Sequence, residues 1–148
     1  MNRILGIFIL FLVVYFGTWI LSDGTGFMSA FNQHNLMKRT AMAGILAIGV
    51  SFVIITGGID LSIGSVVCLV GVGLPYMLID LGWPVWVALL VVAAVPFLIG
   101  AWHGFLITRL NIQPFIATLC GLLIYRGVTR GFTADQSVGY QGEFAMLR

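Results

Sequence analysis

Charged residues are scarce in this chain of 148 residues. They make up only 8% of it, whereas 60% of its residues are hydrophobic. Soluble domains carry roughly a quarter charged residues, so the composition excludes a soluble globular domain. Many of the apolar side chains must therefore face lipid, because one protein core cannot hold them all.

Other absences narrow the possible functions. The only lysine, in Met37-Lys38-Arg39, lacks the preceding glycine and the following Ser or Thr that a Walker lysine needs. The basic residues lie mainly at the ends of apolar runs and form no stripe, so nucleic acid is not an expected partner. Cys68 and Cys120 lie inside apolar runs, and no Cys/His spacing is typical of a metal site. We expect no catalytic residue and no cofactor, and therefore a protein that is not an enzyme.

The apolar runs predict an all-α fold, a polytopic membrane helical bundle of about four to five transmembrane segments. The predicted spans are residues 4–21, 40–56, 62–79 and 84–108. Between the first two, residues 22–35 are predicted to be a loop and 36–39 a short interfacial turn. The last apolar run, 115–125, is shorter than the ~20 residues that cross a bilayer. It predicts a half-helix, a short or re-entrant segment, or a helix extended past its charges.

Glycine and proline interrupt several of these spans. Pro75 is predicted to kink or end the third span. Gly100 and Gly104 form a small-xxx-small pattern, which predicts close packing against another helix. Broken helices are typical of transporters, in which free helix ends lie near a central pathway. The residues alone therefore predict a component of a multi-pass transporter.

The most informative stretch is the turn from Gly57 to Ser62, Gly-Gly-Ile-Asp-Leu-Ser, between two apolar spans. Gly57 and Gly58 are predicted to end a helix with backbone angles that other residues avoid. Asp60 or Ser62 is predicted to cap the next helix by accepting its free N–H groups. Asp60 is also a lone carboxylate between apolar runs, which makes it a candidate for a gate or a pathway contact.

Four further residues are candidates for the gate, the pathway or a turn. His103 is predicted to bond across helices or, alternatively, to contact the transported ligand. Gln113 and Pro114 are predicted to break the chain and start the last helix, since proline suits a first helical position. Thr118 either bonds within its own helix or lines a cavity, and the sequence leaves both open.

Two stretches resemble a known family. Residues 54–65, Ile-Ile-Thr-Gly-Gly-Ile-Asp-Leu-Ser-Ile-Gly-Ser, closely resemble a signature of the permease subunits of bacterial sugar ABC importers, the ribose, xylose and arabinose class. Residues 104–119, Gly-Phe-Leu-Ile-Thr-Arg-Leu-Asn-Ile-Gln-Pro-Phe-Ile-Ala-Thr-Leu, followed by Tyr125-Arg-Gly127, agree with that family in order and spacing. The family commonly has asparagine at the position of His103 and glycine at that of Cys120, so the helix contacts there are expected to differ.

The resemblance implies a multi-pass permease of the bacterial plasma (inner) membrane that provides the translocation pathway for a monosaccharide. It implies an ABC ATPase subunit, a periplasmic or lipoprotein sugar-binding protein, a second permease copy in a dimer, and the lipid bilayer as partners. Members of the family are longer and carry further spans. Residues 1–148 are therefore expected to form a partial (N-terminal), truncated transmembrane permease domain.

Other interpretations stay open at this point. An ion-coupled secondary carrier or channel also fits the broken helices and Asp60. An ABC permease for branched-chain amino acids is a related possibility. A membrane scaffold without transport activity fits the small-residue faces.

Overall fold

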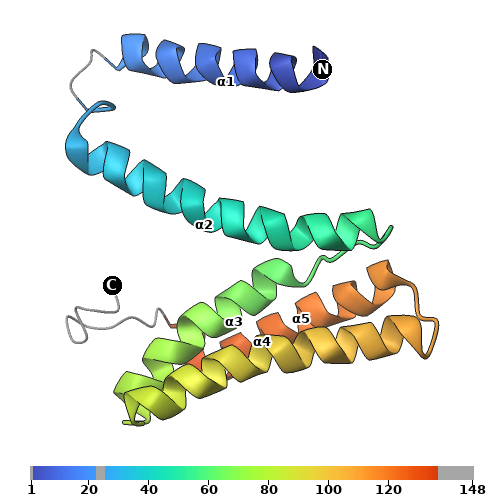
Figure 1. The fold of residues 1–148 in the computed structure, drawn as a ribbon. Helices are drawn as coiled ribbons and strands as arrows, with labels where there is room; N and C mark the ends of the chain where they lie inside the picture. Colours follow the sequence, from blue (N-terminus) through green and yellow to red (C-terminus); the bar gives the residue numbers. More distant parts are fainter. Residues whose placement is uncertain (1, 23–25, 137–148) are drawn as a thin grey trace. The chain divides into compact units, whose positions relative to one another are not determined.

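The computed structural model describes residues 2–22 and 26–136, and these residues form helices, turns and links without a strand. The helices appear in chain order in Figure 1: α1 (Asn2–Leu21), α2 (Ala30–Ile55), α3 (Ile63–Pro75), the short π-helix η1 (Tyr76–Asp80), α4 (Val85–Thr108) and α5 (Pro114–Thr133). Five segments are long and apolar enough to cross a membrane: Ile4–Leu21, Ala30–Ile55, Ile63–Asp80, Val85–Thr108 and Pro114–Thr133. The predicted all-α membrane bundle is confirmed.

The chain divides into two compact units, residues 1–51 and 52–148. In the first unit, the segment before α2 folds against α1 through Tyr15. The Tyr15 and Phe27 rings lie 5.2 Å apart between centroids, and the Tyr15 hydroxyl donates to Gln33 Oε1 at 3.3 Å.

The second helix begins at Ala30, well before the predicted residue 40. The predicted loop therefore ends at residue 29, and the predicted turn at 36–39 is wrong, because those residues are helical. Ser29 supplies the start signal: its Oγ accepts the N–H of Asn32 at 3.2 Å, as an N-cap serine does. The polar run 32–35 hides this start, because its composition is also that of a loop.

A two-glycine motif ends α2. Gly57 has φ of 75° and its N–H donates to the Ile54 carbonyl at 2.9 Å, while the Gly58 N–H donates to the Val53 carbonyl at 2.9 Å. This pair of bonds is a Schellman motif, which satisfies the last carbonyls of a helix. A Cβ on Gly58 would lie 3.2 Å from Val53 Cγ1 and 3.3 Å from the Val53 carbonyl oxygen. The predicted unusual backbone angle is thus right for Gly57 and wrong for Gly58, where the lack of a side chain matters.

The second unit is a bundle in which α3 packs mainly against α5 and also against α4 (Figure 1). Its buried apolar cluster is small and centres on Met77, Leu78 and Ala88. Many large apolar side chains of α4 and α5 are exposed, among them Trp86 and Phe97. Apolar surface of this extent is unstable in water and is expected to face lipid or other membrane segments.

The winding of the third span changes at Pro75, whose side chain is fully buried. The next five residues form η1, and the Leu81 N–H reaches back to the Tyr76 carbonyl at 3.2 Å. Proline lacks a backbone donor and crowds the preceding turn of an α-helix. The α-helical winding therefore ends at Pro75 as predicted, although the span itself continues to Asp80.

The last helix, α5, is a full-length span of 20 residues. Of the three alternatives predicted for this segment, the half-helix and the short or re-entrant segment are wrong. The third, a helix that extends past its charged residues, is confirmed. Arg126 and Arg130 lie within it and are exposed, so their long side chains can reach toward lipid headgroups. Pro114 occupies the start of the helix, as predicted.

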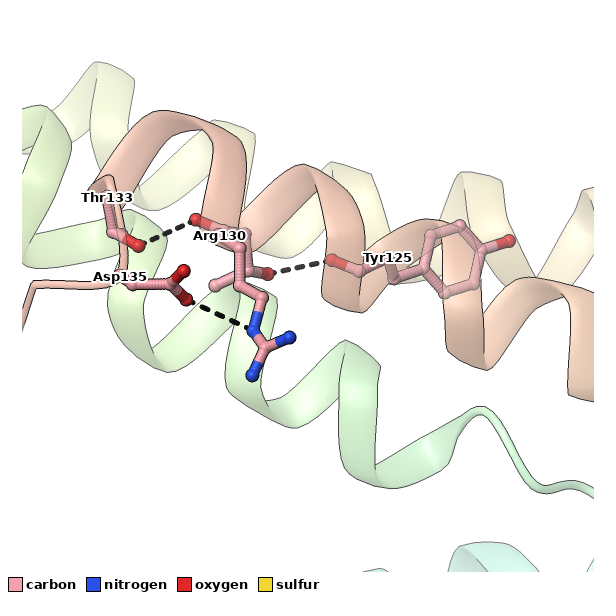
Figure 2. A network of polar contacts seen from close by, with 5 residues as sticks. Tyr125, Arg130, Thr133 and Asp135 are labelled. Atoms are coloured by element: carbon pink, nitrogen blue, oxygen red, sulfur yellow. Dashed lines mark hydrogen bonds and ion pairs between the residues drawn. The ribbon is translucent and has the colours of Figure 1, made fainter.

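Hydroxyl groups on α5 bond within the helix itself. The Thr133 Oγ1 donates to the Thr129 carbonyl (2.9 Å), and the Thr129 Oγ1 donates to the Tyr125 carbonyl (2.8 Å). Dashed lines mark both bonds in Figure 2. Both threonines are buried. Because their hydroxyl protons bond to carbonyls of the same helix, they need no partner from another helix. Arg130, in the last turn of α5, pairs through Nε with Oδ1 of Asp135 just past the helix end at 3.1 Å (Figure 2). Both side chains are largely exposed, so the pair adds little stability.

We expect Gly57→Ala to destabilise the second unit by about 1–2 kcal/mol, because alanine resists the left-handed angle. A Cβ at this position meets no atom within 4 Å, so backbone strain is the whole effect. Gly71→Ala is the matched control, since Gly71 lies inside α3 with equally open space around it. The measurement is thermal unfolding of the full-length protein in detergent. Equal midpoints for the two variants would contradict the assignment of the Schellman motif.

Candidate functional site

A cavity of about 490 Å³ lies where the link between α2 and α3 meets the last turns of α4 and the first turns of α5. This volume is within the roughly 300–1,000 Å³ typical of small-molecule sites. Six of the eight predicted site residues line it: Gly57, Gly58, Asp60, His103, Pro114 and Thr118. Ser62 and Gln113 are not part of the lining, although Ser62 bonds to Asp60 and Gln113 directly precedes Pro114.

A second cavity, of about 350 Å³, is bounded by α3, η1, α4 and α5. Its wall is almost entirely apolar and includes Val91, Val95 and Phe132. Such a wall offers a polar solute no replacement for its bonds to water. The first cavity is therefore the candidate site for a polar ligand.

The Asp60 carboxylate closes the turn before α3. Its Oδ1 accepts the backbone N–H of Ser62 at 2.8 Å and the Ser62 hydroxyl at 2.7 Å. Ser62 is the N-cap residue of α3, but its side chain makes no cap bond to the helix. The predicted cap is thus corrected: Asp60 binds the N-cap residue and none of the first helical N–H groups. A short polar side chain that bonds two residues ahead is an Asx turn.

Thr118 joins α5 to the same link. Its hydroxyl lies 2.8 Å from the Pro114 carbonyl in its own helix and 3.2 Å from the Ile59 carbonyl across the cavity. The side chain is only 3% exposed and also lines the cavity. Both alternatives that the sequence left open for Thr118 are therefore realised.

The imidazole of His103 lies on the α4 side of the cavity and is buried. Its Nε2 is 3.1 Å from the hydroxyl of Tyr125 on α5, so the predicted bond across helices is present. The ring fits because residue 121 is glycine: a Cβ there would lie 2.6 Å from His103 Nε2 and 3.0 Å from Tyr125 Cε2. Sequence reasoning missed both Gly121 and Tyr125 as site residues, because nothing local in the sequence pairs them with His103.

The predicted packing pattern Gly100-xxx-Gly104 serves a different purpose. A Cβ at either position would meet no atom within 4 Å, and both glycines line the cavity. The prediction of close helix packing there is wrong within the described residues. The carbonyl of Gln113 accepts the N–H groups of Ile116 (3.0 Å) and Ala117 (3.1 Å), so Gln113 starts α5 through its backbone, as the predicted break implied.

Comparison with known proteins identifies the family of this chain. Residues 32–145 match the family described as "Branched-chain amino acid transport system / permease component". The chain belongs to this family. Its relatives include the xylose transport system permease protein XylH of Escherichia coli, with 40% identity over 126 residues that cover 85% of this chain and 32% of that protein. No solved structure matches the chain significantly.

Two further relatives are named for other sugars. The galactofuranose transporter permease protein YtfT of Escherichia coli is 38% identical over 126 residues, 85% of this chain and 36% of that protein. The ribose import permease protein RbsC of Bacillus subtilis is 36% identical over 129 residues, 87% of this chain and 38% of that protein. The chain thus spans about a third of the length of the relatives it matches. The permease resemblance, the membrane location and the expectation of a non-enzyme are confirmed at the level of the family.

We expect Asp60→Ala to destabilise the second unit by about 1–3 kcal/mol, because it leaves the buried Ser62 hydroxyl without its acceptor. Asp60→Asn keeps an oxygen at the Oδ1 position and is expected to lose less than half as much. Asp80→Ala, which removes an exposed carboxylate at the end of η1, is the control. Thermal unfolding in detergent measures all three. Equal loss in the alanine and asparagine variants at position 60 would refute the Asx turn as the main role.

Gly121→Ala is expected to destabilise by about 1–3 kcal/mol, because the new methyl group overlaps the His103 ring. Gly127→Ala lies in the same helix with open space around it and is expected to gain about 0.5–1 kcal/mol from better helix propensity. The two changes are chemically identical, so the difference between their unfolding midpoints isolates the contact. Similar midpoints would show that the His103 ring does not lie against Gly121.

Proposed function

We propose that the complete protein is the membrane permease of a bacterial ABC importer and provides the translocation pathway for a monosaccharide in the inner membrane. The observation that carries this proposal is the 36–40% identity to permeases named for xylose, galactofuranose and ribose, over 85–87% of this chain. Residues 1–148 then form part of the transmembrane permease domain. An inner membrane ABC transporter permease protein of Escherichia coli, YjfF, is 40% identical over 111 residues, which supports the location.

The chemistry of the cavity supports a sugar as the solute. Its wall combines a carboxylate (Asp60), an imidazole (His103) and a hydroxyl (Thr118) with backbone groups from the α2–α3 link. A monosaccharide is neutral and carries hydroxyl groups that both donate and accept hydrogen bonds. These side chains, with Gly57 and Gly58 at the turn, are proposed to line one portion of the pathway or its gate.

The proposed division of labour follows from what the sequence contains. Residues 1–148 contain no Walker lysine, and the proposal assigns ATP binding and hydrolysis to the separate ATPase subunit of an ABC importer. A sugar-binding protein outside the membrane delivers the solute, and a second permease copy completes the pathway. The permease itself forms and breaks no covalent bond. It alternates between two packings whose balance the partners shift.

The branched-chain amino acid in the family description is disfavoured by the cavity wall. A free amino acid carries both an ammonium and a carboxylate group, and each loses its hydration when it leaves water. Asp60 could pair with the ammonium group, but no lysine or arginine lines the described cavity to pair with the carboxylate. The relatives at 36–40% identity are likewise named for sugars.

Uptake by the reconstituted complex tests this proposal. The full-length protein, its ATPase and its binding protein are placed in proteoliposomes, and uptake of labelled D-xylose, D-ribose, D-galactose and L-leucine is measured. We expect uptake of a sugar that requires ATP on the side of the membrane where the ATPase lies. This uptake is expected to stop with a hydrolysis-dead ATPase. Collapse of proton and sodium gradients is expected to leave the rate unchanged.

Each alternative gives a distinct result in the same assay. Sugar uptake that persists with the dead ATPase and collapses with an ion gradient would establish an ion-coupled carrier instead. Uptake of leucine alone would replace the sugar by a branched-chain amino acid. No flux of any of the four solutes would refute transport of these classes and favour a scaffold.

A further inference from the structure

The Asp60 carboxylate is fixed at one oxygen and open at the other. Oδ1 accepts two hydrogen bonds from Ser62, at 2.7 and 2.8 Å, which hold the carboxylate in one orientation. Oδ2 makes no hydrogen bond to any described residue, and no described side-chain oxygen is both fully buried and unpaired. Asp60 lines the cavity, and its Oδ2 is free to accept a hydrogen bond.

The imidazole of His103 repeats this arrangement. Nε2 is engaged by the Tyr125 hydroxyl at 3.1 Å, whereas Nδ1 has no partner among residues 2–22 and 26–136. No side-chain nitrogen of the described residues is both fully buried and without a hydrogen-bond partner. Because Nδ1 has no partner, it must be accessible. His103 is only 7% exposed, and it lines the cavity.

The Tyr125 hydroxyl selects which nitrogen of His103 carries the proton. A neutral imidazole has one donor and one acceptor nitrogen, and a phenol proton needs an acceptor. If Tyr125 donates to Nε2, the phenol proton is satisfied and the imidazole proton is on Nδ1. In the opposite arrangement Nε2–H donates to the phenol oxygen. Each arrangement leaves one proton without a described acceptor, on Nδ1 in the first and on the phenol in the second, so the bond itself decides between them. The phenol O–H is a stronger donor than a neutral imidazole N–H, and the imidazole nitrogen is a stronger acceptor than the phenol oxygen. The first arrangement is therefore the more stable one.

We propose that the cavity is a subsite for a neutral solute with neighbouring hydroxyl groups, in which His103 Nδ1–H donates one hydrogen bond and Asp60 Oδ2 accepts another. Tyr125 is the positioning residue that keeps the proton on Nδ1. The inference rests on the proposed function, because it assigns the sugar contacts of that pathway. It also predicts exclusion of sugar phosphates, since the fixed carboxylate repels a second anion in a site without a lining cation.

Nitrogen NMR of histidine tests the tautomer without transport. The full-length permease is labelled with ¹⁵N-histidine, placed in lipid nanodiscs, and the His103 signals are assigned by their loss in His103→Asn. We expect a protonated Nδ1 and an unprotonated Nε2 in the unaltered protein, and a mixture of tautomers in Tyr125→Phe. Tyr76→Phe removes a phenol hydroxyl that bonds to no described residue, and it is expected to leave the His103 signals unchanged. A proton on Nε2 in the unaltered protein would overturn the assignment.

Titration of the same sample tests the subsite. D-xylose, D-ribose and ribose 5-phosphate are added, and the His103 Nδ1 signal is followed. We expect one of the pentoses to shift the signal saturably and the phosphate ester to leave it unchanged. Loss of one hydrogen bond predicts an apparent Kd about 2- to 10-fold higher in Tyr125→Phe and in Asp60→Asn, but unchanged in Tyr76→Phe.

The outcomes separate the two proposals. If neither pentose perturbs His103 at the highest soluble concentration, the subsite is refuted even where the proteoliposomes take up sugar. If ribose 5-phosphate binds as well as ribose, the carboxylate does not select a neutral solute and the inference fails. If the uptake assay shows no sugar transport, the proposed function fails, while the tautomer measurement still decides the role of Tyr125.

Discussion

In a bilayer each backbone N–H and C=O group needs a partner within the protein, and this constraint decides where chemistry can occur in the chain. Along the helices every such group is used, so only helix ends leave donors and acceptors free. The end of α2, the start of α3, the end of α4 and the start of α5 all contribute to one cavity wall or to the turn beside it. Polar side chains collect there as well, since Asp60, His103 and Thr118 line the same wall. The position of the candidate site is thus a consequence of the solvent as much as of any single residue.

Features that depend on neighbours in the chain could be predicted from the sequence. Two glycines followed by an acid and a serine define a turn by their own backbone preferences, and Pro114 fits the first position of a helix whatever surrounds it. Four of the spans follow from composition and length in the same way, except at their ends, whereas the apolar run 115–125 left the length of the fifth open. The start of α2 is not evident from the sequence, because polar residues in a first helical turn have the composition of a loop and only the Ser29 cap distinguishes the two. Helix ends need a specific hydrogen bond, which composition does not reveal.

The contacts that shape the cavity lie beyond such reasoning. Gly121 is one of many glycines in the sequence, and its need to be glycine arises from a histidine ring on another helix. Tyr125 belongs to a recognisable stretch, but its hydroxyl gains a role only because α4 brings His103 within 3.1 Å. Gly100 and Gly104 show the opposite error, since a pattern typical of helix packing faces a cavity instead. The spacing of small residues along one helix identifies a face of that helix. It does not reveal whether that face contacts another helix or a cavity.

The distribution of hydrogen bonds within residues 52–136 has a consequence for motion. Among the described residues, the side-chain bonds that join different elements of this unit are those of Thr118 to Ile59 and of Tyr125 to His103, and both are beside the cavity. Farther along α5, the buried hydroxyls of Thr129 and Thr133 bond only to their own helix. Displacement of α5 at that end breaks no described side-chain hydrogen bond between elements, whereas displacement at the cavity breaks two. A solute that replaces the bonds at the cavity would therefore change the cost of displacing α5 at that end, which is what the proposed coupling of binding to a change of packing requires.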